Sequence, residues 1–88
     1  MESLSIQIAL DFIECTAEQK LKFIQYLESL NWQPINPNKL WAISTFNQGI
    51  ETIQQIESEL ILAKKISQLY ELDYIIISDN KFYFNQLY

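Results

Sequence analysis

The chain opens with a strict alternation of apolar and polar residues. This period of two predicts a β-strand over residues 4–13, with one face turned to the core. Its apolar face carries Leu4, Ile6, Ile8, Leu10 and Phe12. Its other face carries Ser5, Gln7, Ala9 and Asp11. We expect helices to cover the apolar face, which leaves the second face to water or to a partner.

A helix over residues 17–30 follows the strand. Thr16 and Gln19 have the spacing of a capping box, in which each side chain satisfies a free amide of the first turn. Asn31 is a residue type that tolerates the left-handed conformation in which helices often end. The apolar residues of the buried stripe recur at helical spacing: Phe23, Ile24, Leu27 and Leu30.

The middle of the chain predicts two strands and a second helix. Residues 32–35 read as a short edge strand, because Pro34 cannot donate to a ladder. Residues 40–46 predict the next strand, with apolar residues on both faces. A helix follows over residues 50–70, with Asn47 as its N-cap. Its predicted stripe is Ile53, Ile56, Leu60, Ala63, Ile66 and Leu69. Ile61 and Leu62 lie off this stripe, so part of the helix is expected to pack on something besides its own sheet.

The chain ends in a predicted hairpin, whose strands cover residues 74–77 and 82–84. Both of its faces are rich in apolar or aromatic side chains, which is uncommon for a sheet with one solvated face. We therefore predict a homodimer with a shared or swapped final strand. The interface residues expected from this pattern are Tyr74, Ile76, Tyr83 and Phe84.

The order of elements predicts an α+β fold in one domain over residues 1–88. It corresponds to a ferredoxin-like β-α-β-β-α-β plait with an extra C-terminal strand. The alternative is an α+β domain in which residues 32–36 form only a loop.

Composition limits the chemistry. The chain has eleven acids, six lysines and a net charge of −5, and it contains neither histidine nor arginine. Histidine-based catalysis and zinc sites are therefore excluded, and direct nucleic-acid binding is disfavoured. The lone Cys15 fits a reducing, cytoplasmic setting, and we interpret it as a packing residue rather than a reactive thiol. No run of apolar residues approaches a membrane span.

Two acids are candidates for metal chemistry. Asp11 lies near the end of the first strand on its open face, and Glu14 follows just beyond. Carboxylates there suit magnesium or manganese, which prefer oxygen ligands. The alternative is that both are solvated acids at a strand end. Asp73 and Asp79 are interpreted as strand-boundary and turn residues, and Lys64 and Lys65 as complements to a helix dipole.

The segments IQIALDF, DYIIIS and KFYF, in this order, resemble a group of small ferredoxin-like prokaryotic proteins. The group includes the small subunit of the CRISPR adaptation complex, the virulence-associated D-type toxins and the endoribonuclease antitoxins of type V toxin–antitoxin systems. The resemblance implies dimers formed through the open sheet face, often with the last strand added to the neighbour's sheet. It also implies that Asp11 matches the acid proposed for metal binding or catalysis.

Two functions from different classes follow as hypotheses. The first is a small acidic cytoplasmic regulator, antitoxin or inhibitor with a role in prokaryotic defence, which acts as a homodimer by binding a basic or nucleic-acid-binding protein, without a cofactor. The second is an endoribonuclease that uses magnesium or manganese held by Asp11. The first is preferred because fold analogy alone supplies no catalytic site. A homodimeric structural protein is a third reading.

Overall fold

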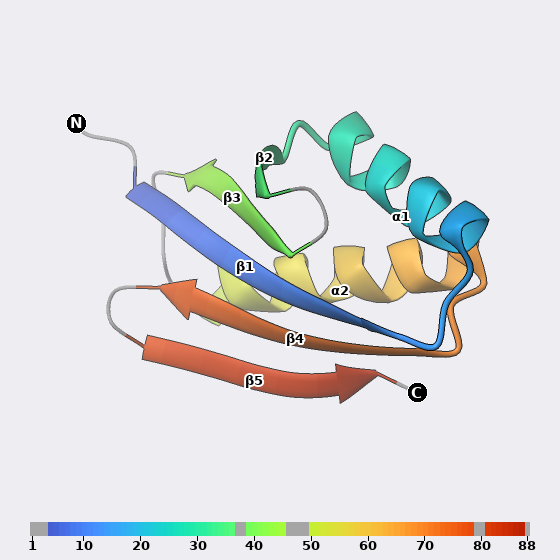
Figure 1. The fold of residues 1–88 in the computed structure, drawn as a ribbon. Helices are drawn as coiled ribbons and strands as arrows, with labels where there is room; N and C mark the ends of the chain where they lie inside the picture. The colour runs from blue at the N-terminus through green and yellow to red at the C-terminus, as the bar shows by residue number, and fades with distance from the viewer. Residues whose placement is uncertain (1–3, 37–38, 46–49, 79–80, 88) are drawn as a thin grey trace.

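The computed structural model describes residues 4–36, 39–45, 50–78 and 81–87, and these form two layers, a sheet and a pair of helices (Figure 1). The elements are β1 (Leu4–Ile13), α1 (Ala17–Ser29), β2 (Gln33–Asn36), β3 (Leu40–Thr45), α2 (Ile50–Ser67), β4 (Glu71–Ser78) and β5 (Lys81–Leu87). Within the described part of the chain, no helix is long and apolar enough to cross a membrane.

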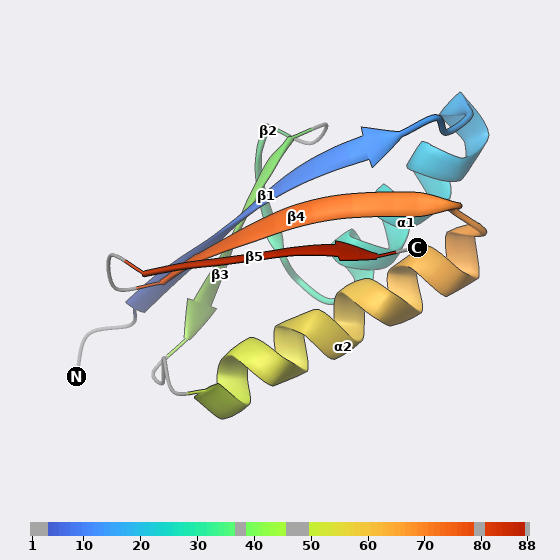
Figure 2. The same cartoon turned by 90° about the horizontal axis from the view of Figure 1, so that it is seen from below.

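All strand pairs are antiparallel, in the order β2-β3-β1-β4-β5. The α+β class predicted from the sequence is confirmed. β5 extends the sheet beyond β4 and forms one of its two edges, so the order differs from that of a simple four-stranded plait (Figure 2). The alternative in which residues 32–36 form a loop is wrong, because β2 pairs with β3.

The core lies between the sheet and the helices. β1 alternates as predicted: Ile6, Ile8 and Leu10 are buried, while Gln7 and Asp11 are exposed. Six residues of the predicted apolar stripes that lie in the core are Ile8, Leu10, Phe23, Leu27, Ile56 and Leu60. The inward face of β3, which the sequence left ambiguous, is the one that carries Trp41 and Ile43.

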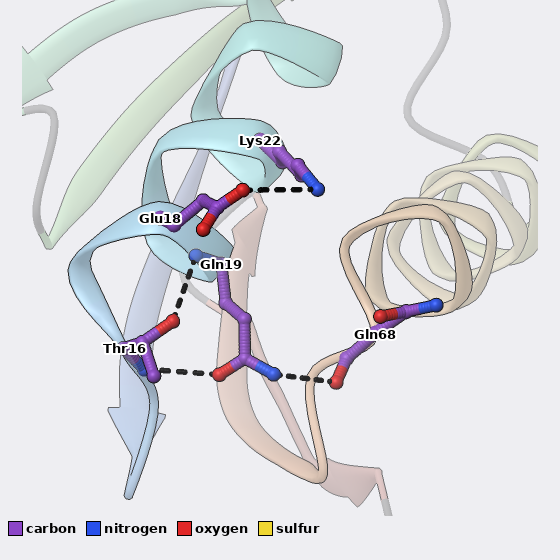
Figure 3. Close-up of polar contacts among 5 residues, drawn as sticks. All are labelled: Thr16, Glu18, Gln19, Lys22 and Gln68. Carbon is purple, nitrogen blue, oxygen red and sulfur yellow. Dashed lines mark hydrogen bonds and ion pairs between the residues drawn. The ribbon is translucent and has the colours of Figure 1, made fainter.

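The capping box of α1 is confirmed and has a second role (Figure 3). The Thr16 backbone N–H donates to Gln19 Oε1 over 2.9 Å, and the Gln19 N–H donates to Thr16 Oγ1 over 3.1 Å. Gln19 Nε2 also donates to the backbone carbonyl of Gln68 over 2.9 Å. One side chain therefore joins the start of α1 to the residue that follows α2.

The second helix ends earlier than predicted. α2 stops at Ser67, because Gln68 takes the left-handed conformation with a φ of 61°. Ser67 is buried and donates to the Ala63 carbonyl over 2.7 Å, whereas Ile66 is 53% exposed. The prediction of Ile66 in the buried stripe is wrong, since four residues after Ala63 place Ser67 on the core side instead. The predicted N-cap, Asn47, lies outside the described residues.

Candidate functional site: the open face of the sheet

Both helices contribute side chains to the core on one face of the sheet, and the other face carries no element of the described chain. In Figure 1 this uncovered face is turned toward the viewer, with α2 behind β1 and β4. We call it the open face. Strand alternation and register assign to it Gln7, Ala9, Asp11, Ile13, Gln33, Leu40, Ala42, Ser44, Glu71, Asp73, Ile75, Ile77, Phe82, Phe84 and Gln86.

Apolar side chains form a continuous row across four strands of the open face. Leu40 of β3 pairs with Ala9 of β1, Ala9 pairs with Ile75 of β4, and Ile75 pairs with Phe84 of β5. Phe84 is 63% exposed. Directly opposed residues in a sheet have their Cβ atoms about 4.5–5.5 Å apart, so these side chains are immediate neighbours on the open face.

A second row runs beside the first. It joins Ala42, Gln7, Ile77 and Phe82 in the same strand order, and Phe82 is 69% exposed. The two phenylalanines thus lie on one face of an edge strand and are largely open to solvent. Exposed aromatic side chains that adjoin other apolar residues are typical of protein-binding surfaces.

Polar residues occupy the next row of the open face. Asp11 pairs with Asp73, and Asp73 pairs with Gln86 of β5. Together with neighbouring apolar residues, which include Ala9 and Phe84, the two acids line a depression of about 180 Å³. Glu71 follows on the same face, opposite Ile13, so the three acids of the open face lie toward one end of it.

The opposition of Asp11 and Asp73 is the feature of this site that the sequence did not reveal. The sequence pattern predicts Asp73 as a strand-boundary residue, but it lies inside β4. One of its carboxylate oxygens, Oδ1, is buried and has no hydrogen-bond partner among the described residues. Two like charges directly opposed across a ladder are unfavourable. The sequence signal was limited to an acid inside the first predicted strand, Asp11, and an acid directly before the predicted strand over residues 74–77, Asp73.

Glu14, the second predicted metal ligand, is placed differently. It follows the end of β1 in a left-handed conformation with a φ of 48°, and its side chain is exposed. Within the described residues, no group of three or more acids, cysteines and histidines is arranged to hold a metal ion. The structure therefore brings Asp11 together with Asp73 rather than with Glu14.

Two of the four predicted interface residues are placed in the core. Tyr74 and Ile76 are 1% and 0% exposed, because β4 turns them toward the helices, so the single chain does not present them at its surface. Tyr83 shares that face and is half-buried. Phe84 alone of the four lies on the open face. In the segment 74–77 every residue is apolar or aromatic, so the pattern itself did not indicate which pair faces outward.

Tyr74 is the centre of a polar contact on the helix side of the sheet. Its hydroxyl donates to Glu57 Oε2 over 2.5 Å and accepts from Asn85 Nδ2 over 3.4 Å. Burial, and then the hydrogen bond to Glu57, raise the pKa of Tyr74 from 10.0 to about 12. The hydroxyl thus stays protonated in neutral solution, and it links α2, β4 and β5.

Two lysines lie close to β1. Lys20 Nζ stands 5.1 Å from the centre of the Phe12 ring, a cation–π arrangement. The carbonyl of Lys39 accepts a hydrogen bond of 2.7 Å from the backbone N–H of Leu10, next to Asp11. Cys15 is half-buried against the core, which agrees with its interpretation as a packing residue.

Comparison with protein-family models, with curated proteins and with solved structures finds no match to this chain. The function of the protein is therefore inferred from the chemistry of its open face.

Proposed function

We propose that the protein is a small acidic regulator, an antitoxin or inhibitor, that acts by binding another protein through its open face. The proposal includes a ferredoxin-like plait with an added strand, which the order β2-β3-β1-β4 supports. It also includes a cytoplasmic location, which fits a chain with a single cysteine.

The observation that carries the proposal is that apolar rows and a row with two acids lie side by side on the open face. The apolar rows end at the exposed Phe82 and Phe84, and the adjoining row carries Asp11 and Asp73. The open face as defined above contains three acids and no lysine. A partner that fits it presents apolar side chains beside lysines or arginines, and the charges favour fast association with such a surface.

The experiment has two stages. The full chain first captures proteins from its native host, and each captured protein is then purified and titrated against it by calorimetry. Leu40→Ser and Asp11→Asn change the open face at β3 and β1, and both should weaken binding. Ile66→Ser is the matched control, because Ile66 is also exposed but lies on α2. Binding should weaken as salt rises, since the charges involved are at the surface.

A purified partner that binds the wild type, Leu40→Ser and Asp11→Asn variants with equal affinity would overturn the proposal. A partner whose binding is lost with Ile66→Ser but kept with Leu40→Ser would move the binding surface to α2.

Metal-dependent endoribonuclease activity is the second candidate. It is favoured by the pairing of Asp11 with Asp73, which places two carboxylates in one row beside the amide side chain of Gln86. Oxygen donors of this kind fit magnesium or manganese. They supply fewer ligands than such ions take, so water or an RNA phosphate would complete the set. The bound ion would stabilise the charge that develops on a phosphate.

This candidate is tested by incubating RNA with the wild type and with Asp11→Asn and Asp73→Asn variants in magnesium or manganese. Cleavage that both substitutions abolish without lowering the melting temperature would rank this function above protein binding. Lys64→Gln is the control, because Lys64 lies on α2 on the opposite side of the sheet. RNA left intact by a folded wild-type protein with either metal would reject the candidate.

A further inference from the structure

A groove lies on the helix side of the sheet, where the end of β5 comes near the second half of α2 (Figure 2). It forms because α2 packs against β4, whereas β5 extends the sheet beyond β4. The groove has a volume of about 380 Å³ and is lined by Ile61, Lys64 and Lys65 of α2 and by Leu87 of β5. Two apolar and two cationic side chains therefore meet in one place, on the other side of the sheet from the open face.

The apolar side of the groove is open to solvent. Ile61 is 51% exposed, and Leu87 packs on the edge of the core but is only half-buried. Leu62, beside Ile61 on the outer surface of α2, is 48% exposed. Lys65 follows Ile61 by four residues and Leu62 by three, so its side chain adjoins both. Adjoining apolar side chains that stay exposed are typical of a surface that a partner covers.

The charge around the groove is opposite to that of the chain as a whole. Neither residues 60–68 nor β5 contains an acid, although the chain has eleven. Among the residues that the structure describes, neither Lys64 nor Lys65 forms an ion pair. Glu57 lies two helical turns, about 10.5 Å, before Lys64 and already accepts a hydrogen bond from the Tyr74 hydroxyl. At physiological salt, exposed charges more than about 8 Å away are largely screened, so the two lysines determine the field at the groove.

The dipole of α2 explains only part of this arrangement. Lys64 and Lys65 lie in the last turn of the helix, where cations stabilise its negative end. That role requires charge alone, and it accounts neither for the exposed Ile61 nor for the groove between α2 and Leu87. An apolar surface beside two cations is complementary to a ligand that has an apolar group beside anions.

We propose that this groove binds an acidic peptide segment of another protein, in which a leucine, isoleucine or phenylalanine lies next to two or more aspartates or glutamates. The apolar side chain packs on Ile61 and Leu87, and the carboxylates pair with Lys64 and Lys65. The site is independent of the proposed function, because it lies on the opposite side of the sheet and takes a ligand of the opposite charge.

The test starts from the immobilised full chain and a phage library of random peptides. Phage that bind the folded Lys64→Glu/Lys65→Glu double variant are removed first, and the peptides then enriched on the wild type are synthesised and titrated by fluorescence anisotropy. They should carry acids next to an apolar residue. The double variant should raise their dissociation constant by about 10-fold or more, because attraction becomes repulsion. Ile61→Ser should raise it by about 10-fold, because the apolar contact is lost.

Two controls separate the groove from other surfaces. Lys22→Glu/Lys39→Glu makes the same change in net charge on α1 and in the turn before β3, and should bind the peptides like the wild type. Leu40→Ser changes the open face and should do the same, although it should weaken the partner of the proposed function. Circular dichroism confirms that each variant is folded.

An enrichment without acidic peptides would overturn the proposal, as would peptides that bind Ile61→Ser with wild-type affinity. An equal loss in Lys22→Glu/Lys39→Glu would overturn it too, because net charge alone would then explain the binding. Light scattering covers the remaining occupant. A wild-type oligomer that Lys64→Glu/Lys65→Glu converts to a monomer would assign the groove to a second copy of the chain and reject the acidic peptide. None of these results bears on binding at the open face, which Leu40→Ser and Asp11→Asn test.

Discussion

Asp11 and Asp73 lie directly opposite each other across the β1–β4 ladder, on the face of the sheet that neither α1 nor α2 covers. Directly opposed like charges destabilise a sheet, and here one oxygen of Asp73 is also buried without a hydrogen-bond partner among the described residues. Natural proteins often accept such a cost where a surface serves a function. The pair therefore supports the proposal that a partner binds the open face where its acids lie.

The first prediction is that removing either charge stabilises the free protein. Asp11→Asn and Asp73→Asn should each raise the free energy of unfolding by roughly 0.2–1 kcal/mol, because each relieves the same repulsion. The double variant should gain little beyond either single one, and the gain should shrink at high salt. Urea unfolding of all four proteins measures this. Single variants that both lose stability would show that the carboxylates are held by favourable contacts.

The sequence predicted those features that local patterns determine. Period-two alternation located β1 and its inner face, and the helical spacing of Phe23 and Leu27 located the buried stripe of α1. The capping box at Thr16 fixed the start of that helix. Each of these depends on residues close together in the chain, so one sequence is sufficient.

The features that the sequence missed depend on long-range register. Ile66 and Leu69 continued the apolar spacing of α2, so the helix was extended too far and Asp73 was placed at the boundary of β4 rather than inside it. The facing of Tyr74 is set by its pairing with Leu10 of β1, and a run of apolar residues gives no local signal for that choice. For this reason the sequence predicts neither the pairing of Asp11 with Asp73 nor the burial of Tyr74.

The second prediction concerns Leu27, which is fully buried in the core. Leu27→Ala should cost about 2–5 kcal/mol, since it removes a packed side chain and leaves a cavity. Glu28→Ala and Gln25→Ala, on the exposed side of α1, should change stability by less than about 0.5 kcal/mol. Chemical unfolding compares the three. Similar losses at Leu27 and Glu28 would mean that α1 is rotated, and the core face of the sheet would need reassignment.

The third prediction concerns alkaline pH. The pKa of Tyr74 in the folded protein, about 12, lies above its value of 10.0 in the unfolded chain. Its contribution to stability is therefore complete below pH 10 and is lost as the pH rises from 10 toward 12, because the unfolded state releases the proton more easily. Unfolding free energies measured across this window should fall more steeply for the wild type than for Tyr74→Phe.

Tyr74→Phe should also cost roughly 1–3 kcal/mol at neutral pH, since it removes the hydrogen bond to the Glu57 carboxylate. Tyr70→Phe is the control, because Tyr70 is exposed, and it should keep the wild-type pH profile. Equal slopes for the wild type and Tyr74→Phe would contradict the raised pKa.

The last prediction separates the two roles of Gln19. Gln19→Ala removes two hydrogen bonds of the Gln19 side chain, the one in which Oε1 accepts from the Thr16 N–H and the one in which Nε2 donates to the Gln68 carbonyl. The substitution should lower the free energy of unfolding by about 1–2 kcal/mol. Gln19→Glu keeps the acceptor but lacks the donor, so it should lose less. Thr16→Ala weakens the cap by about 1 kcal/mol but leaves the contact with Gln68 in place.

Hydrogen exchange distinguishes the cap from the link between helices. The Leu69 N–H donates to the Lys64 carbonyl over 3.1 Å, next to the carbonyl that Gln19 holds. Exchange at Leu69, corrected for global stability, should quicken in Gln19→Ala and Gln19→Glu and stay unchanged in Thr16→Ala, because local opening at the end of α2 depends on the lost donor. Wild-type exchange at Leu69 in Gln19→Glu would show that the bond to Gln68 does not hold the two helix ends together. The early end of α2, which places Asp73 inside β4, would then depend on the left-handed conformation of Gln68 alone.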